Sequence, residues 1–331
     1  MPNLSFQAAM LRNPFQNPYL GEDGYIWWNW LSPFLAHTVG IRSVHAYFVF
    51  CLVIALAIIP VVYAYFRERL DDSNARWRLL LFTCFPCCFA AFYWVGMDAL
   101  TMLLLVLMVR SMSRWPLAVG YGLFLGFQHA EQAAIAIALL AATRWLLDTD
   151  ASPLRGPIAA LLGVMVGRGL LGILAARAVD PPPTRLGYYF THHSSILLSF
   201  VVHLPVVLWA IFGAGWLVWV KGRLNKSERL VVGILLAASI LLSATTMDKT
   251  RVTSVAILPA LLALLASPSF DLAELRATLA PVIALAIVVP VVWVWGGVFS
   301  NLLPFDLTYL VRELFGHPHI SPPLDNWPFR T

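Results

Sequence analysis

Charged residues are scarce in this chain. Asp, Glu, Lys and Arg make up 12% of its 331 residues, whereas 60% of the residues are hydrophobic, and the mean hydropathy is +0.77. This composition excludes an ordinary soluble domain, which needs far more polar surface. Apolar runs of about 17–25 residues recur instead between residues 44 and 300, and each is long enough to cross a bilayer as an α-helix. We therefore expect an all-α, polytopic transmembrane helix bundle.

The chain also lacks internal divisions. No Gly/Ser-rich linker or charge run separates two parts, and the short period-2 alternation of a β-barrel is not evident. We predict one transmembrane helical domain over residues 44–300. An outer-face segment with interfacial aromatic residues, residues 1–43, precedes it, and an outer-face tail, residues 301–331, follows it. The first residues show no basic start, apolar run and cleavage site of a signal peptide.

Cysteine is rare and basic residues are dispersed. The four cysteines, Cys51, Cys84, Cys87 and Cys88, all fall inside apolar segments, which predicts packed free thiols rather than a disulfide framework or a metal site. The sequence pI is near 9.2. The basic residues are nevertheless scattered among short loops, as topology signals are, and we predict no nucleic-acid partner.

Three apolar blocks are too long to be single spans. The block Leu79–Met112 would run about 51 Å as one helix, against a hydrocarbon core of about 30 Å. Gly96-Met97-Asp98 interrupts it midway, and an Asp at the bilayer centre would cost about 3 kcal/mol. The block therefore predicts a helical hairpin with a polar tip. The same argument applies to residues 115–147, interrupted at His129-Ala130-Glu131-Gln132, and to residues 229–267, interrupted at Asp248-Lys249-Thr250-Arg251.

The remaining apolar runs predict single spans, which brings the total to about ten, with both termini outside. These runs are Val44–Phe66, Pro157–Ala178, Ser194–Val220 and Ala280–Ser300. We predict an outer loop over Asp180–His193 and an amphipathic stretch on the outer surface over Asp306–Phe315. Loop cations are more frequent on the side opposite the three tips, which marks that side as cytoplasmic.

This topology gathers ionisable groups at the outer ends of the helices. Carboxylates beside guanidinium and ammonium groups suit an enzyme that removes a proton from a hydroxyl while it stabilises a phosphorylated leaving group. A carboxylate at the edge of a low-dielectric cleft also becomes a better base. The candidate residues are Glu22, Asp23, Asp98, His129, Glu131, Arg185, His192, His193, Asp248, Lys249 and Arg251.

Each candidate also has a purely structural interpretation. Glu22 and Asp23 would form a solvated turn between two glycines. Asp98 would cap the helix that follows it. Glu131 would pair with His129 or with an arginine; Arg168, inside a predicted span, also needs a partner or a route to the interface.

The other candidates have structural interpretations too. Asp248 and Arg251 would form a surface ion pair, which contributes little. His192 and His193 would be a solvated loop pair. A divalent metal bound by Asp, Glu and His is a further alternative, but no motif spacing supports it, and we predict no metal or other cofactor.

The order of these features resembles that of the GT-C class of integral-membrane glycosyltransferases, which use sugars linked to polyprenyl phosphate. That class carries an acidic motif in its first outer loop, comparable to Glu22-Asp23. A pattern like Phe85-Pro86, followed by Tyr93-Trp94-Val95-Gly96-Met97-Asp98-Ala99-Leu100, and a later basic tip like Asp248-Lys249-Thr250-Arg251-Val252 with Pro259, complete the resemblance. One feature differs, because in that class a transmembrane helix precedes the acidic loop, whereas only residues 1–21 precede Glu22 here.

The resemblance implies Asp23 or Glu22 as the catalytic base and Arg251 with Lys249 at the lipid phosphate, while Asp98 shapes the acceptor side. The expected partners are a polyprenyl-phosphate-linked sugar, a glycan or lipid acceptor and membrane lipids. The expected place is the periplasmic face of a bacterial inner membrane, in cell-envelope polysaccharide biosynthesis. Two alternatives stay open. One is a polysaccharide polymerase or ligase, in which Arg185, His192 and His193 matter more; the other is a transporter or a non-catalytic subunit of a membrane complex.

Overall fold

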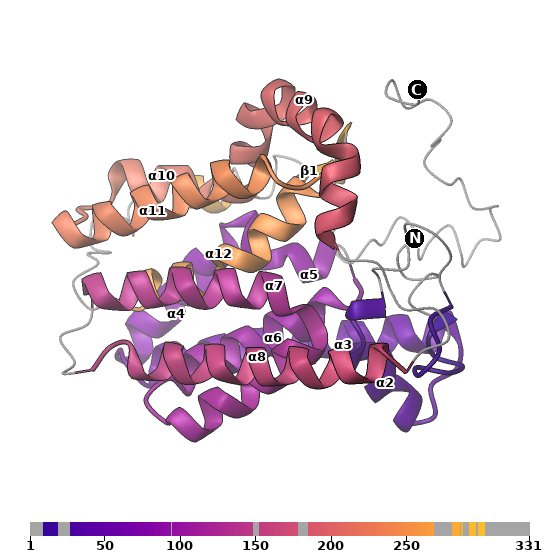
Figure 1. Ribbon diagram of the computed structural model, residues 1–331. Coiled ribbons are helices and arrows are strands. Elements are labelled where there is room, and N and C mark those ends of the chain that lie inside the picture. Colours follow the sequence, from indigo (N-terminus) through magenta and orange to yellow (C-terminus); the bar gives the residue numbers. More distant parts are fainter. Residues whose placement is uncertain are drawn as a thin grey trace.

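The structure, a computed structural model, is built almost entirely from α-helices (Figure 1). It describes residues 9–18, 27–93, 95–147, 152–177, 185–267, 280–284, 286, 291–295 and 297–301. Glu22, Asp23 and the stretch Asp306–Phe315 lie outside these residues. The elements in chain order are α2 (Leu31–Thr38), α3 (Val44–Arg67), α4 (Asp72–Thr83), η2 (Pro86–Phe89), α5 (Ala90–Tyr93), α6 (Asp98–Arg110), α7 (Trp115–Leu147), α8 (Arg155–Ala175), α9 (Arg185–Phe212), α10 (Gly215–Lys221), α11 (Lys226–Ser243), α12 (Lys249–Leu265), β1 (Val291–Trp295) and β2 (Gly297–Asn301).

Fewer helices can span a membrane than the sequence predicted. Among the described residues, four are long and apolar enough, namely α3, α7, α8 and the Tyr189–Phe212 part of α9, and a fifth is possible if α4 and the helical turn after it, bent by 87°, count as one span. The prediction of about ten spans is therefore wrong. Helices α4, α6 and α12 have 12, 13 and 17 residues. At 1.5 Å per residue they reach only about 18–26 Å, short of the hydrocarbon thickness of about 30 Å.

Helix α7 is folded back on itself at His129, where the backbone leaves the helical region (φ −153°, ψ 68°). A straight helix would place Leu147 about 48 Å from Trp115. Gly156, however, lies against Met112, since a Cβ on Gly156 would be 2.3 Å from the Met112 carbonyl oxygen. The connection from Leu147 to Arg155 reaches at most about 29 Å. The two arms of α7 must therefore form the hairpin that the interruption at residues 129–132 predicts.

Helix α8 packs directly on the first arm of α7 through glycines. A Cβ on Gly163 would lie 2.2 Å from the Val119 carbonyl oxygen, and one on Gly167 would lie 2.2 Å from that of Leu123. The two backbones touch at these points, as small residues allow between helices in membranes. The constant offset between the contacting residues shows that α8 runs parallel to this arm.

The other two hairpins are those of the blocks 79–112 and 229–267. The ends of their helices that lie away from the tips are joined at the end of the bundle opposite His129. Ser267, just after α12, donates a hydrogen bond of 3.1 Å to Glu228 in the first turn of α11. Arg78 of α4 donates to the carbonyl of Leu265, and Arg110, the last residue of α6, pairs with Glu68 just after α3. We call this end the basal end and the opposite one the tip end.

Two predicted segments are wrong. Ala280–Ser300 is not a transmembrane helix, because Val291–Trp295 and Gly297–Asn301 pair as antiparallel strands with Trp293 opposite Phe299. Valine and tryptophan favour strands, and an apolar run of this kind does not distinguish a buried strand from a helix. The predicted outer loop Asp180–His193 is helical from Arg185 onward, as the first turns of α9.

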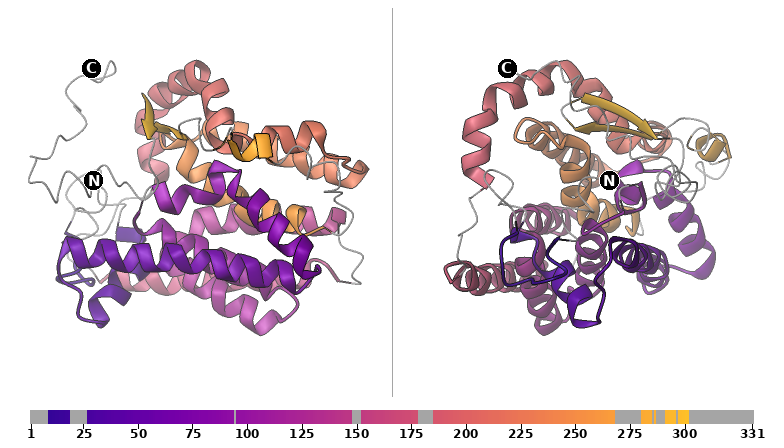
Figure 2. Two further views of the ribbon diagram at one scale, coloured as in Figure 1. Left: turned by 180° about the vertical axis from the view of Figure 1, so that it is seen from behind. Right: turned by 90° about the vertical axis from the view of Figure 1, so that its right-hand side faces the viewer.

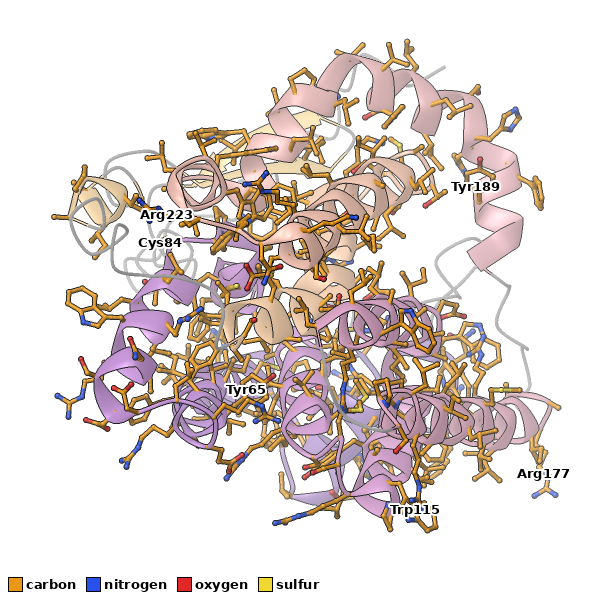
Figure 3. The ribbon with its side chains drawn as sticks, turned by 90° about the vertical axis from the view of Figure 1, so that its left-hand side faces the viewer. Tyr65, Cys84, Trp115, Arg177, Tyr189 and Arg223 are labelled. Carbon is orange, nitrogen blue, oxygen red and sulfur yellow. The ribbon has the colours of Figure 1, made fainter. Side chains whose placement is uncertain are left out.

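Helix α9 arches over one side of the bundle and lies next to the strands (Figure 2). It ends at Gly213, whose φ of +47° is the left-handed conformation that glycine adopts easily. This turn packs on Pro86 of η2. Figure 3 shows the side chains filling the space between the helices, with Trp115 at the edge of the bundle and Arg177 pointing away from it. All four cysteines are buried free thiols, as predicted.

Candidate functional site

The three polar tips meet at one place in the structure. Asp98 begins α6, and its Oδ2 accepts a hydrogen bond of 2.8 Å from Nη1 of Arg251 in the first turn of α12. Nε of the same guanidinium donates to Asp248, the residue before α12. His129, at the fold of α7, places its Nδ1 3.6 Å from Asp98 Oδ1. These four side chains form one cluster, which we call the tip cluster.

The tip cluster has a buried part and a part that reaches the surface. The side chains of His129 and Asp98 are 1% and 2% exposed, whereas those of Asp248 and Arg251 are each 16% exposed. Burial raises the pKa of the Asp248 carboxyl above its ordinary value, against the opposing effect of Arg251. Two carboxylates share one guanidinium, so the cluster carries one negative charge when His129 is neutral and none when it is protonated.

One oxygen of the cluster has no hydrogen bond. Asp98 Oδ1 is buried and accepts none from the described residues. His129 Nδ1 lies 2.8 Å from Thr101 Oγ1, which places the imidazole between the threonine hydroxyl and the carboxylate. The unused Oδ1 of Asp98 is therefore a buried acceptor that lies 3.6 Å from this ring nitrogen, beyond hydrogen-bond distance.

Sequence reasoning missed Gln128, which joins the elements around the tip cluster. Its Oε1 accepts 2.8 Å from the backbone N–H of Ser32 in α2, and its Nε2 donates 3.0 Å to the Met97 carbonyl. One fully buried amide therefore joins α2, α7 and the start of α6. Its position directly before His129, in an otherwise apolar block, is a signal that could have identified it.

Lys249 lies next to the cluster but faces another way. Its ammonium group donates to the carbonyls of Ile196, Ser243 and Thr246, at 2.9–3.2 Å, and the residue is fully buried. All three ammonium donors are thus used by backbone acceptors. Lys249 fixes α9 to the tip of the α11–α12 hairpin, and β1 is held at the same tip, where the Val294 N–H donates to Thr250 Oγ1.

Glu131 belongs to a second group at the α7 fold. Its carboxylate lies 3.3 Å from the Arg168 guanidinium of α8, and that guanidinium stacks over the Trp28 ring, 3.4 Å from the ring centroid. The pairing of Glu131 with an arginine, one of the structural interpretations, is therefore what the structure shows. The same contacts provide the partner that Arg168 needs inside an apolar helix.

The remaining candidates belong to α9 or lie outside the described residues. Arg185 is the first residue of α9, and His192 and His193 lie in its early turns, where His193 Nδ1 is 2.9 Å from the Phe190 carbonyl. The ion pairs that define the tip cluster come from the starts of α6 and α12 and the fold of α7, and not from α9. Glu22 and Asp23 are outside the described part of the chain.

The structural interpretation of Asp98 as a helix cap is wrong. Asp98 is the first residue of α6 rather than the residue before it, and no side-chain hydrogen bond caps this helix. Its carboxylate is turned toward Arg251 and His129 instead.

The described residues contain no group of three or more His, Cys, Asp and Glu side chains placed to hold a metal ion. The chain matches no protein-family model, no curated protein and no solved structure.

Proposed function

We propose that this protein is a membrane glycosyltransferase that moves a sugar from a polyprenyl-phosphate donor to a glycan or lipid acceptor at the tip end, on the outer face of the bacterial inner membrane. The observation that carries the proposal is the ion pair of Asp98 with Arg251, because it brings an acidic and a basic group from distant parts of the chain together between apolar helices. Such a place excludes water and strengthens electrostatic interactions with a charged substrate.

Arg251 is the group proposed to stabilise the leaving phosphate. Its ion pairs with Asp248 and Asp98 use Nε and Nη1, and its side chain reaches the surface while Asp98 lies beneath it. The two carboxylates more than neutralise this guanidinium, so a phosphate that approaches from the surface is proposed to displace Asp248 from Nε and to take over its charge-assisted hydrogen bond. Lys249, which the resemblance placed at the same phosphate, is assigned here to holding the tip in shape.

The base that deprotonates the acceptor hydroxyl is proposed to be Asp23, with Glu22 as its neighbour. Their role as the base is what the resemblance implies. Asp98 and His129 are proposed to shape the acceptor side from beneath, where Asp98 holds Arg251 in place. The polymerase or ligase alternative is less favoured, since it gives weight to Arg185, His192 and His193 of α9, whereas the tip cluster is built from α6, α7 and α12.

The test is a transfer assay with the purified full chain in proteoliposomes. Wild type should release prenyl phosphate from a lipid-linked hexose or pentose when cell-envelope glycan is supplied. Removing a group that stabilises transition-state charge costs about 10²–10³-fold in rate. We therefore expect Arg251→Gln and Asp23→Asn each to lower the release by that order.

The matched controls are Arg76→Gln and Asp71→Asn, which change the same residue types at the exposed basal end. Thermal unfolding identifies variants that fail to fold, and only variants that unfold as wild type does are compared in the assay. If wild type releases prenyl phosphate and neither Arg251→Gln nor Asp23→Asn lowers the release, the roles assigned to Arg251 and Asp23 are refuted. Absence of release from any polyprenyl-phosphate sugar would favour a transporter or a non-catalytic subunit.

A further inference from the structure

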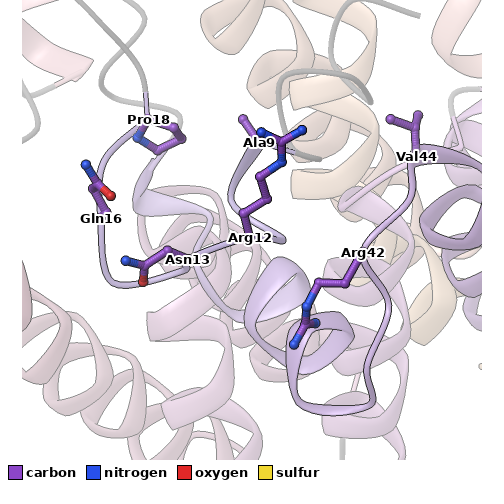
Figure 4. Close-up of a pocket in the computed structure, with 7 residues that line it drawn as sticks. All are labelled: Ala9, Arg12, Asn13, Gln16, Pro18, Arg42 and Val44. Atoms are coloured by element: carbon purple, nitrogen blue, oxygen red, sulfur yellow. The ribbon is translucent and has the colours of Figure 1, made fainter.

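A polar cavity lies apart from the tip cluster, beside the segment that precedes α2. It has a volume of about 530 Å³, and Figure 4 shows Asn13, Gln16 and Pro18 on one side, Arg12 and Ala9 in the middle, and Arg42 and Val44 on the other. The cavity lies at the tip end, because its lining residue Val44 begins α3, and the other end of α3 lies next to Glu68 at the basal end. It is therefore at the same end of the bundle as the proposed transferase site.

The two charged side chains among the described lining residues are both positive. Arg12 is exposed and forms no ion pair or hydrogen bond with the described residues, and Arg42 uses only its Nη1, which donates to the carbonyls of His37 and Ile41. The described lining residues include no carboxylate. These two guanidinium groups have no acidic partner in the described part of the chain, unlike Arg67, Arg76 and Arg110 at the basal end.

The wall that carries Arg12 is held in place before any ligand binds. Met10 and Leu11, on its N-terminal side, are fully buried. The indole N–H of Trp30 donates 2.8 Å to the Pro14 carbonyl, and His37 Nδ1 lies 2.7 Å from the Leu11 carbonyl. A preformed wall reduces the entropy that binding would otherwise cost.

We propose that this cavity binds a phosphate group, supplied either by a phospholipid headgroup or by a soluble phosphate ester. Guanidinium groups match phosphate oxygens in geometry as well as in charge. The amides of Asn13 and Gln16 add neutral donors, and the volume is larger than a bare phosphate needs, which leaves room for the group esterified to it. This site is separate from the tip cluster, and it stands whether or not the protein is a transferase.

The test measures phosphate binding by the full chain in nonionic detergent at low ionic strength. Calorimetric titration with inorganic phosphate is one arm. Titration with phosphatidylglycerol against phosphatidylcholine, followed by the fluorescence of tryptophans such as Trp30, is the other. We expect Arg12→Gln to weaken binding by about ten- to a hundredfold, because a hydrogen bond to a charged group is lost, and we expect Arg12→Gln/Arg42→Gln to weaken it further. Arg76→Gln is the control.

The outcomes separate the sources of the phosphate. Binding of inorganic phosphate that Arg12→Gln weakens supports the site and shows that a soluble ester suffices. If phosphatidylglycerol binds selectively and Arg12→Gln weakens its binding, the site is supported and the phosphate comes from a lipid headgroup. Equal affinities of wild type and the double variant in both arms, or no binding by wild type in either, would overturn the proposal. Arg12 bonds to no described residue, so Arg12→Gln should fold normally, which thermal unfolding checks.

Discussion

At the tip end, Asp98, Asp248 and Arg251 pair inside the protein, whereas at the basal end Asp72 pairs with Arg67 and Arg76 at the surface, where these side chains are 40–71% exposed. Surface pairs are screened and contribute little to stability. Buried pairs lose their hydration and often stabilise no more than an apolar replacement would. A buried ion pair at the meeting point of three hairpins is thus poorly explained by stability alone, which supports a role in binding or chemistry.

The largest difference between the two ends should appear in the free energy of unfolding when one carboxylate of an ion pair is removed, Asp98 at the tip end or Asp72 at the basal end. Asp98→Ala removes the buried partner of the partly buried Arg251 guanidinium and leaves it only Asp248 as an acidic partner among the described residues, and breaking a buried pair costs about 3–5 kcal/mol. Asp72→Ala should change the free energy of unfolding far less, because its pairs are exposed. Unfolding of both variants in mixed micelles measures the difference. Equal losses would mean that the tip cluster is no more tightly coupled than the surface.

A smaller difference is expected between two glycines of α8. Gly163 touches the backbone of α7, whereas a Cβ on Gly172 would meet nothing within 4 Å. Gly163→Leu should therefore force α7 and α8 apart and lower the free energy of unfolding by about 1–3 kcal/mol or more. Gly172→Ala is the matched control, and it should stabilise by about 0.5–1 kcal/mol because alanine is the better helix former. A harmless Gly163→Leu would contradict the close packing that fixes the α7 fold.

The smallest effect concerns acid at the basal end. The Asn74 backbone N–H donates to Asp71, the residue that caps α4, and this lowers the pKa of the Asp71 carboxyl. A lowered folded-state pKa gives a stabilisation that is complete above the unfolded-state pKa and is lost as the pH falls toward the folded-state value. Asp71→Asn keeps a good cap without the titration. Its free energy of unfolding should therefore fall less than that of wild type when the pH is lowered from neutral to below the ordinary Asp pKa. Equal sensitivity would show that the lowered pKa of the Asp71 carboxyl contributes nothing to the pH dependence.

The sequence predicted the tips better than it predicted the spans. Asp98, His129 and Asp248 each interrupt a long apolar block, and the cost of a polar group within a bilayer is a local property that a sequence displays. The span count failed because short helices such as α6 and α12 form hairpins without crossing about 30 Å on their own. The strands at residues 291–301 were missed because an apolar run does not reveal its backbone conformation.

The composition of the tip cluster was only partly predictable. Gln128 and Thr101 join it through hydrogen bonds that depend on how α2, α6 and α7 pack, and no spacing rule in the sequence encodes those contacts. Lys249 follows Asp248 directly and yet points into a different set of acceptors, because successive helical residues face different sides. Which of several neighbouring charges share a site is decided by packing.

A double-mutant cycle on Asp98→Asn and Arg251→Gln tests most directly whether distant tips converge. The free energies of unfolding of wild type, both single variants and the double variant give the coupling between α6 and α12. Contacting residues show interaction energies of about 0.5–3 kcal/mol, and we predict a value in the upper half of that range. Additivity within about 0.3–0.5 kcal/mol, as separate sites show, would contradict the convergence of the tips.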